Sequence, residues 1–135
     1  VQRAMERLEL ICDMYLSVST PVQLAAADLI ARGADVRRQV LERVRTNHAV
    51  LRGMVGAYPS CDVLDAEAGW SAVLRIPART GEEEVVLDLL ERDGVVVHPG
   101  YFFDFPHEAF LVVSLLPPVD RFREGLARLL ERVHV

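Results

Sequence analysis

The sequence predicts an α+β fold in which helices pack on one side of a small mixed β-sheet. Two apolar runs rich in Val and Phe, at 95–97 and 109–116, are bounded by Pro and Gly, as buried strands are. Two more strand patterns precede them, and five segments repeat apolar residues at helical spacing. Three of the five helical segments precede the first strand. A layer of helices packed on one sheet is the arrangement that buries their apolar faces.

Composition limits the classes of function. The 135 residues suit one domain with a buried core. A formal net charge of −5 argues against a nucleic-acid partner, whose phosphates attract basic surfaces. The sequence contains no apolar run near the ~20 residues that cross a membrane, and no signal-peptide pattern, so we expect a cytoplasmic protein without a membrane partner. Cys12 and Cys61 are predicted to be reduced, buried thiols.

Three helices are expected in the first part of the chain. Residues 1–16 repeat apolar side chains every three or four positions. Thr20 is expected to cap a second helix with Pro21 at its first position, and Gly33 to end it. Asp35 is expected to cap the longest helix, at 36–57, whose predicted buried stripe is Val36, Val40, Val44, Leu51 and Val55.

Two strands and a helix follow. Residues 61–64 form a short predicted strand, and 70–76 alternate in polarity, with Trp70, Ala72, Leu74 and Ile76 on one face. Thr80 and Glu83 fit a capping box at a helix start, and acidic residues there suit the helix dipole. Asp93-Gly94 is expected to close that helix.

The stretch 95–118 carries the strongest pattern. Its two strands are joined by a connector with four aromatic rings, which either cover a core edge or line a wall that faces a ligand. Four ionisable side chains of this stretch lie on turns, and we expect no metal site from them: His98, Asp104, His107 and Glu108. Residues 120–133 then form an amphipathic helix, with Phe122, Leu126, Leu129, Leu130 and Val133 inward.

Several segments in order resemble a known family. They are V-V-V-H-P-G-Y-F-F at 95–103, F-L-V-V-S at 110–114, Y-L-S-V-S-T-P-V-Q at 15–23 and A-G-W-S-A-V-L-R-I-P at 68–77. Together they resemble the C-terminal small domain of class I/II aminotransferases, the pyridoxal-phosphate (PLP) enzymes with the fold of aspartate aminotransferase. The resemblance covers nearly the whole chain, but only the C-terminal third of such an enzyme.

The resemblance implies a domain organisation and an activity. Residues 1–34 would be a helical segment leaving a large domain absent from this chain, and residues 35–135 the small domain. The full-length enzyme would transfer an amino group between an amino acid and a 2-oxo acid, with PLP held mainly by the large domain. It would act as a homodimer. This part would recognise substrate and close the active site.

Site residues follow from the same resemblance. Trp70, Tyr101 and Phe103 would lie near the substrate, and Ser19 and Thr20 near the dimer interface and the partner's cofactor. Val112 occupies the position of the family's carboxylate-binding Arg and offers neither charge nor donor. Another Arg, with Arg75 a distant candidate, would have to replace it. Alternatively, the substrate lacks that contact, or the enzyme is a divergent transaminase or lyase.

No lysine occurs in the sequence, since all fifteen basic residues are Arg. PLP enzymes hold their cofactor as a Schiff base with a lysine amine, which Arg cannot provide. We therefore expect the chain, which opens at Val1 inside a helical pattern, to be an inactive fragment with no catalytic residue of its own. The alternative is an independent α+β ligand-binding or oligomerisation module whose aromatic connector forms an adhesive surface.

Overall fold

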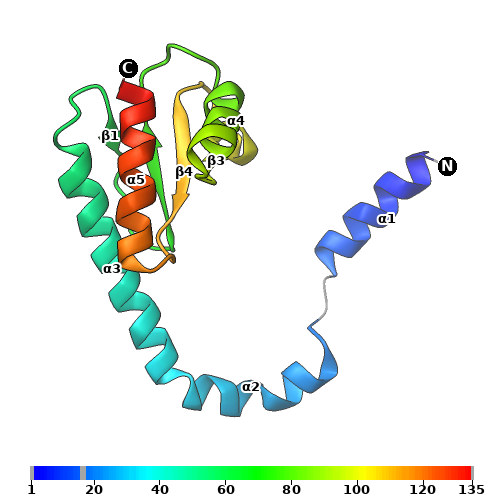
Figure 1. Cartoon of the computed structure of the whole chain (residues 1–135). Coiled ribbons are helices and arrows are strands. Elements are labelled where there is room, and N and C mark those ends of the chain that lie inside the picture. The colour runs from blue at the N-terminus through cyan, green and yellow to red at the C-terminus, as the bar shows by residue number, and fades with distance from the viewer. Residues whose placement is uncertain (1, 16–17, 135) are drawn as a thin grey trace. The chain divides into compact units, whose positions relative to one another are not determined.

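The computed structural model describes residues 2–15 and 18–134, so Val1, Leu16, Ser17 and Val135 lie outside the described residues. The chain divides into two compact units, Val1–Arg37 and Arg38–Val135. Each unit is described by itself below. Figure 1 labels the helices and strands.

The first unit is helical. Helix α1 spans Gln2–Met14 and helix α2 spans Thr20–Arg32. Ser19 is the N-cap of α2, so the prediction that Thr20 caps this helix is wrong by one residue. The predicted end at Gly33 is confirmed, because its N–H donates to the carbonyl of Leu29.

The apolar side chains of α1 are exposed, where the sequence predicted a buried stripe. Met5, Leu8 and Tyr15 are each more than half exposed. Cys12 is exposed as well, which corrects the prediction of a buried thiol, whereas Cys61 is buried as expected. A single amphipathic helix buries its apolar face only where another element packs against it, and no described residue of this unit does so for α1.

The second unit is an α+β domain, which confirms the predicted fold class. It begins within helix α3, Ala34–Val55, and continues with β1 (Asp62–Val63), β2 (Ser71–Arg75) and helix α4 (Glu82–Asp93). Strand β3 (His98–Pro99), the 3₁₀ helix η1 (Gly100–Phe103), strand β4 (Phe110–Ser114) and helix α5 (Val119–His134) complete it. No helix among the described residues is long and apolar enough to span a membrane.

The sheet has the strand order β1-β2-β4-β3, and all three pairings are antiparallel. The predicted mixed sheet is therefore wrong in this detail. The crossover through α4 does make β2 and β3 run in the same direction, as a β-α-β connection should. However, β4 lies between them and pairs with both, so the two parallel strands never touch.

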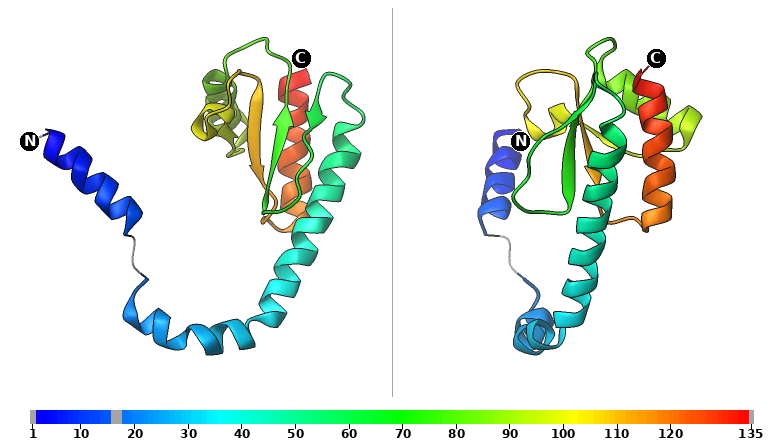
Figure 2. Two further views of the ribbon diagram at one scale, coloured as in Figure 1. Left: turned by 180° about the vertical axis from the view of Figure 1, so that it is seen from behind. Right: turned by 90° about the vertical axis from the view of Figure 1, so that its left-hand side faces the viewer.

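Helices α3, α4 and α5 cover one face of this sheet (Figures 1 and 2). The strand residues directed to that face alternate with those directed away, which is the period of two expected for a half-covered sheet. Leu74 pairs with Leu111 and Ala72 with Val113, and all four are buried. They join one core with Leu51 of α3, Leu89 of α4 and five residues of α5: Phe122, Leu126, Leu129, Leu130 and Val133. These five are the predicted ones.

Four local predictions need correction. Asp35 lies in the first turn of α3 and not at its cap, and Val36 and Val40 are exposed. The predicted Thr80 capping box does not form, because Gly81 is the N-cap of α4 and no side chain bonds there. Residues 95–97 are not a strand; pairing with β4 begins at His98. Gly94 does close α4, with the left-handed φ of 64° that favours glycine.

Candidate functional site

The face of the sheet that carries no helix, called here the helix-free face, is built around Val112. In the antiparallel register, Val112 lies opposite Val73 on one side and opposite His98 on the other, so the three side chains share this face. Val112 is 7% exposed, whereas His98 is exposed. The loop 64–70, between β1 and β2, runs along this side of the sheet (Figure 2). The centre of the face is therefore an apolar floor with a histidine at its edge.

Arg75 is the cationic residue of β2 on this face. It lies diagonally from Val112, since its own partner in the register is Phe110. Diagonal neighbours have Cα atoms roughly 7–8 Å apart, within reach of a guanidinium group. Its guanidinium already donates to the carboxylate of Asp62 at 3.3 Å, and both side chains are more than half exposed. An exposed pair of this kind is weak, and Arg75 can exchange partners at little cost.

An aromatic corner, defined here as Tyr101, Phe102 and Phe103 of η1, follows β3 after Gly100. The three side chains are 48%, 62% and 53% exposed. The ring of His98 lies 6.1 Å from those of both Phe102 and Phe103. The corner therefore stands beside the helix-free face as a group of solvent-facing rings. The fourth ring of the connector, that of Phe105, is half-buried and stacks on Phe110, so only the three rings of the corner are free of the domain's own packing.

The structure separates the predicted substrate residues into two places. Tyr101 and Phe103 lie at the Phe110 end of β4, because Glu82 binds the backbone N–H groups of both Tyr101 and Phe110. Trp70 lies at the other end, where its carbonyl accepts from Leu115. The five residues of β4 between these ends span roughly 13 Å. Trp70 is 61% exposed, so it does not join the core with Ala72, Leu74 and Ile76, the residues with which it was predicted to share a face.

Ser19 and Thr20 belong to the first unit. Both residues are exposed, and the Ser19 side chain makes no capping hydrogen bond. Among the described residues, no group of three His, Cys, Asp or Glu side chains is placed to hold a metal ion.

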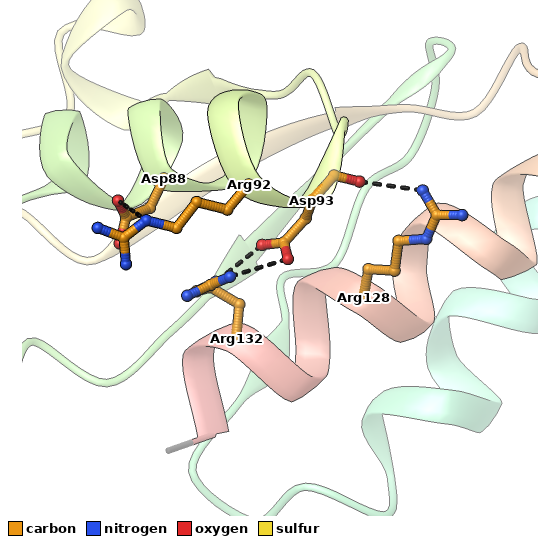
Figure 3. A network of polar contacts seen from close by, with 5 residues as sticks. All are labelled: Asp88, Arg92, Asp93, Arg128 and Arg132. Atoms are coloured by element: carbon orange, nitrogen blue, oxygen red, sulfur yellow. Dashed lines mark hydrogen bonds and ion pairs between the residues drawn. The ribbon is translucent and has the colours of Figure 1, made fainter.

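On the side of the sheet that the helices cover, a polar network joins α4 to α5 (Figure 3). Arg132 donates to both carboxylate oxygens of Asp93, at 2.7 and 2.8 Å. Arg128 donates to the Asp93 carbonyl at 3.0 Å, and Arg92 pairs with Asp88 one turn earlier. The hydrogen bonds from Arg132 lower the pKa of Asp93, and the same contact raises the pKa of Arg132. This network fixes the end of α4 from which the chain enters β3.

A cavity of about 300 Å³ lies on the helical side of the domain. Its walls come from 94–97, the end of β4 and residues 121–129 of α5, including Val97, Val113, Phe122 and Leu126. Arg121 and Arg128 line it as well, but both pair with Glu124. The cavity is on the opposite side of the sheet from Val112.

Glu82 is a functional candidate that the sequence pattern did not reveal. It is 2% exposed, and its carboxylate accepts hydrogen bonds from Tyr101 and Phe110. It stands next to Glu83 and Glu84 in the first turn of α4, and an acidic first turn is normally exposed. The signal that could have identified it is the glycine at 100, because a glycine between a strand and an aromatic run marks a close backbone approach.

A four-stranded antiparallel sheet, a helical layer on one face and a split β-α-β unit define a small α+β domain. No family model and no curated protein matches the sequence. Solved structures do match. The chain is similar to a PLP-dependent aminotransferase from Streptococcus suis 89-1591, with a TM-score of 0.74 and 17% identity over 96% of this chain and 34% of that one.

Two further structures give the same result. An aspartate aminotransferase from Thermotoga maritima matches with a TM-score of 0.68 and 21% identity, over 90% of this chain and 30% of its own. A probable N-succinyldiaminopimelate aminotransferase from Thermus thermophilus matches with a TM-score of 0.54 and 26% identity, over 69% of this chain and 23% of its own. The chain therefore has the fold of the C-terminal domain of PLP-dependent aminotransferases and spans about a third or less of their length.

Proposed function

We propose that this chain is the C-terminal part of a PLP-dependent aminotransferase that transfers an amino group between an amino acid and a 2-oxo acid. The match to the Streptococcus suis enzyme carries the proposal, because it covers 96% of the chain at a TM-score of 0.74. The exposed aromatic corner supports it, since a domain that closes over a substrate needs solvent-facing side chains to meet that substrate.

The two regions have different roles in this proposal. Residues 35–135 form the small domain, and residues 1–34 the helical segment that leaves the large domain. Apolar side chains exposed on α1 and α2, among them Leu10, Ile11 and Leu24, support the second assignment. An apolar surface of this kind is normally covered in the complete protein. The full enzyme would be a homodimer in the cytoplasm.

Tyr101, Phe103 and Val112 are the proposed substrate-recognition residues of this domain. The rings of the corner and the valine floor offer an apolar, water-excluding wall to a bound amino acid. Trp70, at the far end of β2, would line the rim of the entrance. Ser19 and Thr20 remain proposed for the dimer-interface side near the partner's cofactor, where their exposed hydroxyl groups are available as donors.

PLP, when bound, supplies the electron sink for amino-group transfer. The residues of this chain do not fit its covalent attachment, because the sequence contains no lysine. The proposal therefore gives the chain no covalent step. It assigns to these residues only substrate contact and the exclusion of water, and it predicts that the chain alone is inactive.

The test has two parts. Added PLP should give the 135-residue chain no new visible absorption band and no transaminase activity. The product of a reading frame extended upstream of Val1 should contain a lysine-bearing α/β region, absorb visible light with PLP, and convert at least one amino acid from a panel. An extended product that lacks such a region, or that binds PLP without transferring amino groups to any 2-oxo acid, would contradict the proposal. The first outcome would favour an independent ligand-binding or oligomerisation module, to which the exposed aromatic corner would supply the contact surface.

A further inference from the structure

The carboxylate of Glu82 joins three segments that are far apart in the sequence. Glu82 is the first residue of α4 and is 2% exposed. Its Oε1 accepts from the N–H of Phe110 at 2.7 Å, at the start of β4, and its Oε2 accepts from the N–H of Tyr101 at 3.0 Å, in η1. One side chain thereby fixes the aromatic corner to both the sheet and the helical layer.

Burying this group is costly. Glutamate is rarely found fully buried, because removing a carboxylate from water costs several kcal/mol unless hydrogen bonds replace the water. Here two N–H donors and the N-terminus of α4 offset the cost. Helix α4 does not need Glu82 for capping, since the exposed Glu83 and Glu84 already complement its dipole. The carboxylate therefore acts on the corner.

Two residues close to the corner have unfavourable backbone conformations. Asp104, directly after η1, has a φ of 55°, and Ala109, directly before β4, has a φ of 86°. They are the two non-glycine residues with positive φ in the described part of the chain. Residues other than glycine rarely adopt a positive φ, and they keep this conformation only where the surrounding structure holds them.

Gly100 adds a third constraint. A Cβ at this position would lie 2.8 Å from the Cβ of Phe110 and 3.1 Å from Oε1 of Glu82. Only glycine allows η1 to approach β4 this closely. Two strained residues and an obligatory glycine thus lie within the turn-rich segment 100–109, and the buried carboxylate of α4 binds this segment and the start of β4, while the rings of the corner remain exposed to solvent.

We infer that Glu82 is a positioning residue: its carboxylate sets where the rings of Tyr101 and Phe103 stand beside the helix-free face. The contact of these rings with a substrate rests on the proposed function, whereas their position relative to the sheet does not. If that function is correct, Glu82 acts on substrate recognition without touching the substrate.

The first test uses Glu82→Gln in the 135-residue chain. A carboxamide has one acceptor oxygen, and its NH₂ group would face an N–H donor, so one of the two hydrogen bonds is lost. A charge-assisted bond of about 1.5–3 kcal/mol corresponds to roughly ten- to hundredfold faster local amide exchange. By NMR, the Tyr101 or Phe110 amide should lose protection to that extent, and the ring signals of the corner should shift. The methyl signals of Leu126 and Leu129 in the core should not move.

The matched control is Glu83→Gln, which makes the same change of charge one residue later at an exposed position. It should leave both amides and all ring signals unchanged. Folded Glu82→Gln with wild-type exchange and wild-type ring signals would overturn the inference. A measurement without substitution covers the case in which the variant does not fold: in the wild type, the Tyr101 amide should exchange as slowly as amides within β4. Exchange at the rate of an unstructured peptide would also overturn it.

The link to function is tested separately, in an extended gene product that has transaminase activity. There Glu82→Gln should raise KM for the amino acid by about tenfold and change kcat less, because the rings contact bound substrate. An unchanged KM in an active enzyme would remove the functional link. An extended product with no activity would refute the proposed function, and the amide measurements would still decide the role of Glu82.

Discussion

Substitutions at Asn47 test how helix α3 is attached to the rest of the domain. The Asn47 side chain is 0% exposed, and its amide nitrogen donates to the carbonyls of Leu115 and Pro117, at 2.9 and 2.8 Å. These carbonyls belong to the loop between β4 and α5, which lies roughly 70 residues further along the chain. The amide thus gives two backbone carbonyls of this loop their hydrogen-bond donor.

The expected loss of stability follows from the hydrogen bonds that each substitution at Asn47 removes. Asn47→Ala removes two hydrogen bonds of about 1–1.5 kcal/mol each and leaves two carbonyls without a donor, so we expect a loss of about 2–4 kcal/mol. Asn47→Asp has nearly the same shape but replaces the donor with an acceptor that faces two carbonyl oxygens. An uncompensated buried charge costs about 3–5 kcal/mol, so the aspartate variant should be the less stable of the two.

Urea unfolding followed by the fluorescence of Trp70, the single tryptophan, and by circular dichroism measures these differences. The control is Thr46→Ala, since the Thr46 hydroxyl is exposed and donates to the Glu42 carbonyl within α3 itself. It should change the free energy of unfolding by less than about 0.5 kcal/mol. A loss below about 1 kcal/mol for Asn47→Ala, or an aspartate variant more stable than the alanine variant, would refute the argument.

Two further predictions concern titratable groups. Because Arg132 lowers the folded-state pKa of Asp93 below its ordinary value of 3.8, the pair stabilises the fold fully above that pH and less as the pH falls through the lower folded value. The difference in urea midpoint between wild type and Asp93→Asn should thus be present at about pH 6 and shrink below about pH 4, whereas Asp88→Asn should show little difference at either pH. Burial raises the pKa of the Cys61 thiol, and Cys12 is exposed. A thiol reagent at neutral pH should therefore label one cysteine of the native chain quickly, identified by mass spectrometry as Cys12, and label Cys61 at a similar rate only in denaturant; fast native labelling of Cys61 would contradict its burial.

The elements of the fold were predictable where a pattern repeats over several turns or strand residues. Helix α5 is the clearest case, because all five of its predicted core residues are buried. Pattern alone could not show that β4 enters between β2 and β3, since strand order depends on pairing between distant segments. Nor could it show that α1 exposes its apolar side chains, because amphipathicity identifies the face that seeks a partner and not whether the partner is in the same chain.

For the candidate site, the sequence predicted which types of residue are present but not how they are arranged. The aromatic run at 101–103 was evident, but its exposure depends on how η1 is held against β4. The group that holds it, Glu82, has the same chemistry as its two exposed neighbours in the sequence E-E-E. Asn47 was hidden in the same way, since a polar residue on a helix normally faces water. Single buried polar residues leave no periodic signal, and both of these act across long sequence separations.

The missing arginine at position 112 limits what this domain contributes to the proposed reaction. Val112 is packed between Val73 and His98, so the centre of the helix-free face has no cation to bind a carboxylate. Arg75 can reach the centre diagonally, but it does so against the competing carboxylate of Asp62. An exposed ion pair of this type is worth at most about 1 kcal/mol, so a substrate carboxylate in a drier site would displace Asp62. Under the proposed function, these residues therefore supply an apolar wall, and the charge of the substrate is neutralised by Arg75 or by an arginine outside this chain.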